Sequence, residues 1–202
     1  YPVIINSAPA GGLNYSWTVP DQINTGCRVK ISDADDATVY DTSNADFVIM
    51  GTFTISAPNG SEVWTVNTQQ NITWSVVGTV SNVKLSYSTD SGATYPNVII
   101  ASTENSSPYN WTIPDAIYNT CRVRVADAAN DDAYDVSNGN FKIKGILTVT
   151  APNGNETWPI NSVQNVTWSR VGSVASVKIE YSTNGFSDES QTATIIAGTP
   201  VV

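Results

Sequence analysis

The 202 residues of the chain include no histidine, and this absence removes whole classes of chemistry. A Ser-His-Asp or Cys-His nucleophile cannot be assembled without an imidazole, and histidine is also the commonest zinc ligand. The G-x-S-x-G elbow of hydrolases, the phosphate-binding P-loop and the dinucleotide-binding glycine pattern are missing too. We therefore expect this chain not to be an enzyme.

Charged side chains are scarce, at 13% of the residues, which is about half the ordinary share. Nine Lys and Arg stand against 18 Asp and Glu, giving a net charge of −9, and no basic stretch offers contacts to phosphates. No apolar run approaches membrane-spanning length, and the first residues show no signal-peptide pattern. We expect neither nucleic-acid binding nor membrane insertion. Ser, Thr, Asn and Val make up much of the remainder, which is typical of an extracellular β protein.

Cysteine is rare as well, with only Cys27 and Cys121, which are 94 residues apart. The same offset relates long stretches of the chain, so the two cysteines occupy the same position in two successive repeats. Equivalent points on successive modules should lie far beyond the ~4.4–6.8 Å Cα separation of a disulfide. We expect two free thiols that act as small core residues, and they do not identify the compartment.

The repeat itself is plain in the sequence. "APNGSEVWTVNTQQNITWS" (57–75) returns as "APNGNETWPINSVQNVTWS" (151–169), and the stretch 15–51 returns as 109–145. A period of 94 residues is too long for a solenoid unit and suits a β-sandwich. We divide the chain into the back part of one repeat (1–50), a complete repeat (51–145) and the front part of a third (146–202). Because the chain opens in mid-repeat, we expect it to be a piece of a longer, processed polypeptide.

Within the repeat, apolar and polar residues alternate over short runs separated by turn residues, as strands require. In "QNITWSV", for example, Ile72, Trp74 and Val76 share one face. The alternation predicts an all-β fold of tandem immunoglobulin-like antiparallel β-sandwiches, with about seven strands in each. Only Gly51 and Gly145 separate the last strand of one repeat from the first strand of the next. Linkers this short predict a stiff rod.

The recurring motifs PNG-x-E-x-W, [IV]TWS, V-K-[LI]-x-YS, WT[IV]P and C-R-V-[RK] extend over the whole chain. They resemble a family of extracellular immunoglobulin-like repeats. This family is similar to the N-terminal domain of fungal cell-wall glucan-assembly proteins and Ser/Thr-rich GPI-anchored surface proteins. Bacteria and archaea use such modules in tandem in secreted or surface proteins. The resemblance implies an extracellular, cell-surface or cell-wall location. The sequence has no hydrophobic GPI-signal tail, so fungal anchoring is not carried over.

Two acidic loops are the best candidates for a metal site. Calcium takes six to eight oxygen ligands, which clustered carboxylates on a loop can supply. In the predicted sandwich these loops face the preceding module, so a bound calcium ion would stiffen the joint. The alternative is that the acids are solvated turn residues. The candidates are Asp33, Asp35, Asp36 and Asp41 in the first loop, and Asp127, Asp131, Asp132 and Asp135 in the second.

Other recurring residues point to the fold rather than to chemistry. Glu62 returns as Glu156 and Asp21 as Asp115, whereas a catalytic group is needed only once. Trp64, Trp74 and Trp111 fall on inward positions, so we expect them in the core rather than on a carbohydrate-binding platform.

Seven N-x-[S/T] sequences could accept glycans in a secreted protein. Their asparagines are Asn14, Asn59, Asn71, Asn105, Asn110, Asn155 and Asn165.

Two functions are consistent with these observations. The first is a non-enzymatic structural protein that forms a stiff surface stalk, sheath or filament and whose partners are copies of itself or neighbouring repeats. In one form of this hypothesis the tail of one subunit completes the head of the next; the other is that a longer array was cut. The second function is a spacer or a glycan-binding module that contacts cell-wall polysaccharide.

Overall fold

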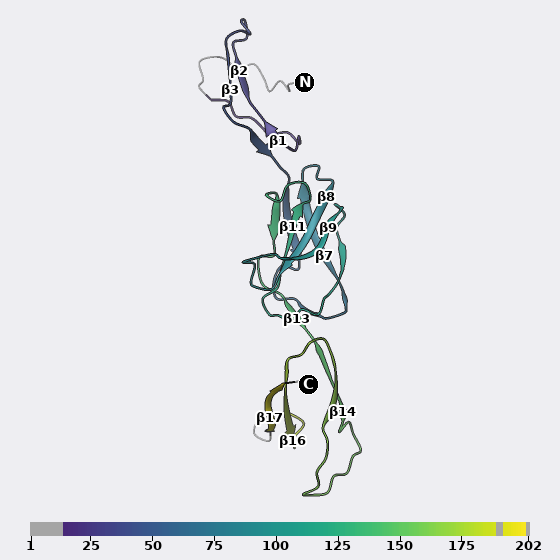
Figure 1. Cartoon of the computed structure of the whole chain (residues 1–202). Coiled ribbons are helices and arrows are strands. Elements are labelled where there is room, and N and C mark those ends of the chain that lie inside the picture. The colour runs from purple at the N-terminus through teal and green to yellow at the C-terminus, as the bar shows by residue number, and fades with distance from the viewer. Residues whose placement is uncertain (1–13, 189–191, 201–202) are drawn as a thin grey trace.

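The computed structural model describes residues 14–188 and 192–200. Residues 1–13 of the first predicted repeat, and 189–191 and 201–202 of the third, lie outside this range. The described residues form β-strands and connecting segments without a helix, so the all-β prediction is confirmed. Accordingly, this part of the chain contains no helix long and apolar enough to cross a membrane. Figure 1 shows three groups of strands in a row, with the most extensive group in the middle.

Residues 51–145, which we call the central sandwich, contain nine strands. They are β5 (Thr52–Ala57), β6 (Val63–Thr65), β7 (Gln69–Val77), β8 (Asn82–Ser88), β9 (Asn97–Glu104), β10 (Tyr109–Thr112), β11 (Arg122–Asp127), β12 (Tyr134–Val136) and β13 (Lys142–Lys144). One sheet has the order β10-β7-β5 and the other β12-β11-β8-β9. All pairs within these two sheets are antiparallel.

The prediction of a purely antiparallel sandwich is wrong for one pair. Strands β6 and β13 run parallel, with Ile143 opposite Trp64. Strand β5 pairs with β7. The chain then turns at Pro58–Gly60 and continues as β6, which pairs with β13. Both carboxylate oxygens of Glu62 fix this turn, because they accept the N–H groups of Asn59 and Gly60, each at 2.8 Å.

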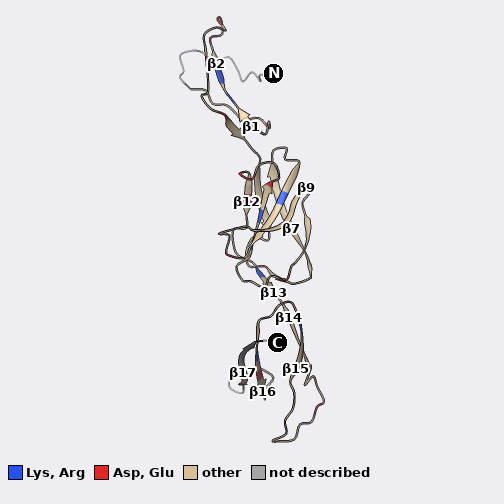
Figure 2. Cartoon of the chain, in the orientation of Figure 1, with Lys and Arg blue, Asp and Glu red and all other residues tan. Residues whose placement is uncertain are grey.

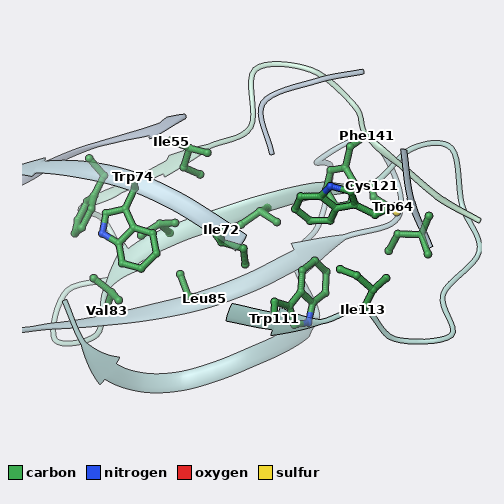
Figure 3. Packing of buried hydrophobic residues seen from close by; sticks show 14 of the residues in the cluster. Ile55, Trp64, Ile72, Trp74, Val83, Leu85, Trp111, Ile113, Cys121 and Phe141 are labelled. Atoms are coloured by element: carbon green, nitrogen blue, oxygen red, sulfur yellow. The ribbon is translucent and has the colours of Figure 1, made fainter. Parts of the chain in front are cut away.

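The two sheets enclose one apolar core (Figure 3). Most of the predicted inward positions are buried there, because alternate residues of a strand point to the same face, and Val76 is partly buried. They include Phe53 and Ile55, Ile72 and Trp74, Val83 and Leu85, Cys121, Val123 and Val125, and Phe141 and Ile143. Trp64 and Trp111 are buried as well, with their ring centroids 6.1 Å apart in an edge-to-face contact. The prediction that these tryptophans belong to the core is therefore confirmed for the central sandwich.

The outer groups are smaller. The N-terminal strands (residues 14–50) contain β1 (Asn24–Cys27), β2 (Lys30–Ser32), β3 (Tyr40–Thr42) and β4 (Phe47–Ile49), paired as β1-β4 and β2-β3. The C-terminal strands (residues 146–200) contain β14 (Ile146–Ala151), β15 (Thr167–Val171), β16 (Ser176–Ser182) and β17 (Thr192–Pro200), paired as β14-β15 and β16-β17. Their registers copy the central ones: Val149 faces Trp168 as Ile55 faces Trp74.

Both cysteines are free thiols, and their surroundings differ. Cys121 is buried in the core, whereas Cys27 is half-buried. Burial raises the pKa of the Cys121 thiol from 9.0 to about 11, because a thiolate is poorly solvated in an apolar core.

We expect Cys27 to be alkylated rapidly in the dilute native protein and Cys121 only as fast as the sandwich opens. Between pH 9 and 11 the unfolded chain loses a proton that the folded chain keeps, so the free energy of unfolding should fall as the pH rises through this range. Mass spectrometry after timed alkylation and urea titrations at several pH values measure the two effects. Cys27→Ser is the control, and its one remaining thiol, Cys121, should be alkylated slowly. Equal native rates for both thiols would contradict the assignment.

Candidate functional site

In the first acidic loop the carboxylates bind neighbouring backbone groups. Asp33 Oδ1 accepts the N–H groups of Asp35 at 2.9 Å and Asp36 at 3.4 Å. Asp36 Oδ1 accepts both the N–H (3.0 Å) and the hydroxyl (2.6 Å) of Thr38, which holds the pKa of Asp36 below its ordinary value. Asp41 lies in β3 and is exposed. The carboxylates of Asp33 and Asp36 therefore shape their own turn.

In the second loop, two acids have structural partners close to the core. Asp127 Oδ1 accepts the N–H of Ala129 at 2.8 Å, repeating the bond of Asp33 to Asp35. Asp135 Oδ2 accepts the N–H of Ile55 at 2.7 Å and so links β12 to β5. Asp135 therefore ties the two sheets together rather than forming a local turn.

The other two acids of this loop lie on the surface. Asp131 forms an ion pair with Lys84 at 2.9 Å, and the N–H of Asp132 donates to Asn130 Oδ1 at 3.1 Å. Within residues 14–188 and 192–200, no three His, Cys, Asp or Glu side chains come together in a group that could hold a metal. Calcium binding stays a prediction. Five of the eight acids have carboxylate partners within the fold: Asp33, Asp36, Asp127, Asp131 and Asp135.

The loop that follows β11 faces the N-terminal strands. Asp127, Ala128 and Ala129 line a shallow hollow together with Ile23, which lies upstream of Gly51, and with residues 79–82. Ile23 is partly buried against the core of the central sandwich. This contact crosses the boundary at Gly51 between the N-terminal strands and the central sandwich. We call this boundary the first joint, and the boundary at Gly145 between the central sandwich and the C-terminal strands the second joint.

A pair of hydrogen bonds fastens this first joint. Asp21 Oδ1 accepts the N–H of Thr79 at 2.9 Å, and Asp21 Oδ2 accepts the Thr79 hydroxyl at 2.5 Å. One carboxylate therefore binds two donors of a single residue on the far side of the linker Gly51. Both bonds favour the ionised acid, so the pKa of Asp21 lies below its ordinary value.

The second joint repeats this geometry. Asp115 Oδ1 accepts the N–H of Ser173 at 2.8 Å, and Asp115 Oδ2 accepts the Ser173 hydroxyl at 2.5 Å. These bonds again lower the pKa of the carboxyl group. Thr79 corresponds to Ser173, and Asp21 to Asp115, at the offset of 94 residues. The two joints are therefore held by equivalent hydrogen bonds between equivalent residues.

Glycines let the strand groups approach closely at the joints. A Cβ on the linker Gly51 would lie 2.7 Å from Val80 Cγ2, and one on Gly145 would lie 2.7 Å from the Val171 carbonyl oxygen. Gly172, beside Ser173, has a φ of +88°, and a Cβ there would lie 3.1 Å from Asp115 Oδ1. A larger side chain at these positions would push the two sides apart.

The recurrence of Asp21 and Asp115 was visible in the sequence, but their partners were not identified. The signal was present: the V-G-[T/S]-V motif at 77–80 and 171–174 recurs at the same offset as the P-D-x-I motif at 20–23 and 114–117. Both motifs flank the linker glycine in the folded chain.

The candidate glycosylation sites differ in their surroundings. Asn71 and Asn110 are exposed, and so are Asn14, Asn155 and Asn165. Asn105 is half-buried: its Oδ1 accepts the Trp74 indole N–H at 2.8 Å, and its Nδ2 donates to the Val80 carbonyl at 3.0 Å. Asn59 Oδ1 accepts the N–H of Asn138 at 2.7 Å. A glycan on Nδ2 of Asn105 would have to fit at this half-buried position beside the Val80 carbonyl, so the exposed asparagines are the better sites for a glycan.

No protein-family model matches this chain, and neither does any curated protein.

Asp115→Ala should speed hydrogen exchange of the Ser173 amide several-fold, because that N–H loses its acceptor. In the native chain the protection should be complete above the ordinary aspartate pKa of 3.8 and fade as the pH falls through the lowered value. Site-resolved exchange by NMR measures both effects. Asp131→Ala, which removes an exposed acid far from this joint, is the matched control. Unchanged exchange at Ser173 in Asp115→Ala would show that the joint is not held by this carboxylate.

Proposed function

We propose that this chain is a non-enzymatic structural part of an extracellular protein. In this proposal, tandem immunoglobulin-like β-sandwiches form a stiff stalk, sheath or filament at the cell surface. The observation that carries the proposal is the joint, which occurs twice with equivalent partners, an aspartate and a hydroxyl residue, at nearly the same distances.

The joint supports stiffness in three ways. The linker is a single glycine, so little chain is free to bend. Two hydrogen bonds to one carboxylate fix the rotation of one side against the other, because both donors must be aligned. Ile23 also packs against the neighbouring core, so hinge motion would expose apolar surface.

The arrangement of strands supports the immunoglobulin-like assignment. A sheet ordered β10-β7-β5 packs on a sheet ordered β12-β11-β8-β9, which matches the two sheets of such a sandwich. The resemblance of the sequence motifs to extracellular repeats points the same way.

The surface chemistry supports a location outside the cell. Charges are sparse and scattered along the chain (Figure 2), and the net charge is −9. Ser, Thr and Asn residues occupy outward positions of β5 and β7, and at least Asn71 and Asn110 present exposed glycan acceptors.

Glycan binding by tryptophan is less well supported. Trp64, Trp74 and Trp111 are buried in the central sandwich and present no flat face to a sugar ring. A spacer role uses the same stiff rod and remains the alternative.

Small-angle X-ray scattering from the dilute chain should give the profile of one elongated, rigid particle. A variant with four Gly-Ser residues inserted after both Gly51 and Gly145 should broaden the distance distribution, because the carboxylates no longer reach their partners. The distance distribution of the double variant Asp21→Ala and Asp115→Ala should be intermediate in width between those of the native chain and the insertion variant. Indistinguishable profiles for the native chain and the insertion variant would overturn the stiff-rod proposal.

The surface location has its own test. Antibodies raised against residues 51–145 should label intact, unpermeabilised cells of the source organism, with a cytosolic protein as the negative control. Labelling only after permeabilisation would exclude a surface stalk or sheath.

A further inference from the structure

The outer face of the sheet β12-β11-β8-β9 has basic side chains in a chain whose net charge is −9. Arg122 and Arg124 are two residues apart in β11, so their side chains leave the same face of the strand. The residues opposite them in β8 are the small Ser88 and Ser86. The guanidinium group of Arg124 lies over the ring of Tyr134, with its Cζ 4.1 Å from the ring centroid. We call Arg122, Arg124 and Tyr134 the basic face.

The cations at this face recur in the repeat. Six of the nine Lys and Arg residues occupy three repeat positions, namely Arg28 and Arg122, Lys30 and Arg124, and Lys84 and Lys178. The contact with a tyrosine recurs as well, because Lys30 Nζ lies 4.1 Å from the centroid of the Tyr40 ring. The recurrence indicates that the fold holds these cations in place. The differences between the repeats show where it leaves them without a counter-ion.

The first difference concerns Arg122. In the N-terminal strands, Asp46 Oδ1 accepts the Nε–H of Arg28 at 2.5 Å and forms an ion pair with it. The residue equivalent to Asp46 is Asn140, and its Oδ1 accepts the Nε–H of Arg122 at 2.7 Å. The central sandwich therefore keeps the hydrogen bond and lacks the negative charge.

The second difference concerns Arg124. In the C-terminal strands, Glu180 forms an ion pair with Lys178 at 2.5 Å. The residue equivalent to Glu180 is Ser86, which lies opposite Arg124. Within the part of the chain that the structure describes, neither Arg122 nor Arg124 forms an ion pair with a carboxylate. Both arginines therefore keep their positive charge uncompensated.

Two acids on the adjoining loops have other partners. Asp131, in the loop after β11, forms its ion pair with Lys84, and only its carbonyl oxygen accepts from Arg124. Asp90, in the turn after β8, accepts the N–H of Thr94 at 3.0 Å and the Thr94 hydroxyl at 2.6 Å. Neither carboxylate is bound to an arginine of the basic face.

Each arginine has donors left for a ligand. Arg122 donates from Nε to Asn140 and from Nη1 to the Ser137 carbonyl at 3.4 Å, and its Nη2 has no acceptor among the described residues. Arg124 donates from Nη2 to the Asp131 carbonyl, whereas its Nε is buried without a hydrogen-bond partner in the described part of the chain. A guanidinium group binds a carboxylate through two parallel N–H groups. The basic face therefore suits a ligand with carboxylates.

The groups beside the arginines favour a sugar over a peptide. Tyr134 is 52% exposed, and the Tyr95 hydroxyl and Arg122 Cδ approach the same glycine, since a Cβ on Gly92 would lie 3.0 Å from each. A tyrosine offers an apolar ring together with a hydroxyl, which matches a sugar ring and its hydroxyl groups. A peptide that adds to a sheet pairs with the main chain of an edge strand. On this face the main chains of β11 and β8 already pair with each other, so only side chains are offered.

We propose that the basic face of the central sandwich binds a polysaccharide of uronic acids. Arg122 and Arg124 bind its carboxylates, and Tyr134 packs against a sugar ring. The inference goes beyond the proposed structural function and does not depend on the stiffness of the joints. The net charge of −9 does not prevent binding, because charges more than about 8 Å away are largely screened at physiological ionic strength.

Binding of the full chain to polygalacturonate, measured by isothermal titration calorimetry, tests the proposal. Fully methyl-esterified polygalacturonate is the matched ligand, because it keeps the sugar chain and lacks the charge. The native chain should bind the acidic polymer but not the ester, and the affinity should fall as the salt concentration rises. Binding to neither polymer, or to both equally, would overturn the proposal. Equally tight binding to polyglutamate of the same length would identify an acidic protein as the partner and would overturn the polysaccharide.

Asn140→Asp supplies the central sandwich with the acid that Asp46 provides in the N-terminal strands. It should weaken binding of polygalacturonate about tenfold, because Arg122 then has an internal counter-ion. The fold should be kept, since the acceptor for Arg122 Nε remains. Asn71→Asp is the matched control, because it adds the same charge at an exposed position of β7, in the other sheet. Equal affinities of the two variants would contradict the proposed site.

A second pair of variants removes a positive charge. Arg124→Gln should weaken binding about tenfold or more, because a charged donor to the carboxylate is lost. Lys142→Gln removes the same charge from an exposed position of β13 and should bind like the native chain. If both variants lost affinity equally, the binding would depend on overall charge, and the assignment to the basic face would be wrong.

Discussion

A β-sheet with one apolar face is stable in water only when something covers that face, and this constraint organises the whole chain. In the central sandwich the sheets β10-β7-β5 and β12-β11-β8-β9 cover each other and bury Ile72, Leu85 and Val123. The outer groups have the same inward residues but only two-stranded sheets, so Ile31 and Val149 remain exposed. The same requirement explains why the central sandwich buries its inward residues on both sheets.

The joints depend on the sandwich in turn. Asp115 can reach Ser173 only because its own loop, after β10, and the loop after β15 are held at fixed positions by their sheets. The linker Gly145 is closely packed, because a Cβ on it would lie 2.7 Å from the Val171 carbonyl oxygen. Under the proposed stiff-rod function, such a joint would fix the orientation of one strand group against the next, whereas a flexible linker would set only a limit on the distance between them.

The strands and core residues could be predicted from the sequence because the period-two alternation is strong in β7, β8 and β11. The short strands β6 and β12 were not predictable this way, since three residues carry too little alternation. The parallel pairing of β6 with β13 depends on where the chain turns after β5, which no local pattern encodes. For the acidic loops, composition predicted oxygen ligands for calcium. Calcium binding stays a prediction. In the folded chain, backbone N–H groups donate to Asp33, Asp127 and Asp135, and the positions of such donors cannot be read from residue types alone.

The recurrence of Asp21 as Asp115 first indicated a residue of the fold rather than of a functional site, and for an enzyme that distinction would hold. It does not hold for an array. What an array provides is a fixed relation between one module and the next, so the residues that set this relation must recur once per module. Asp21 with Thr79, and Asp115 with Ser173, meet that condition, and each pair spans the linker glycine. Under the proposed structural function, a residue that repeats at both boundaries is therefore the first candidate for function.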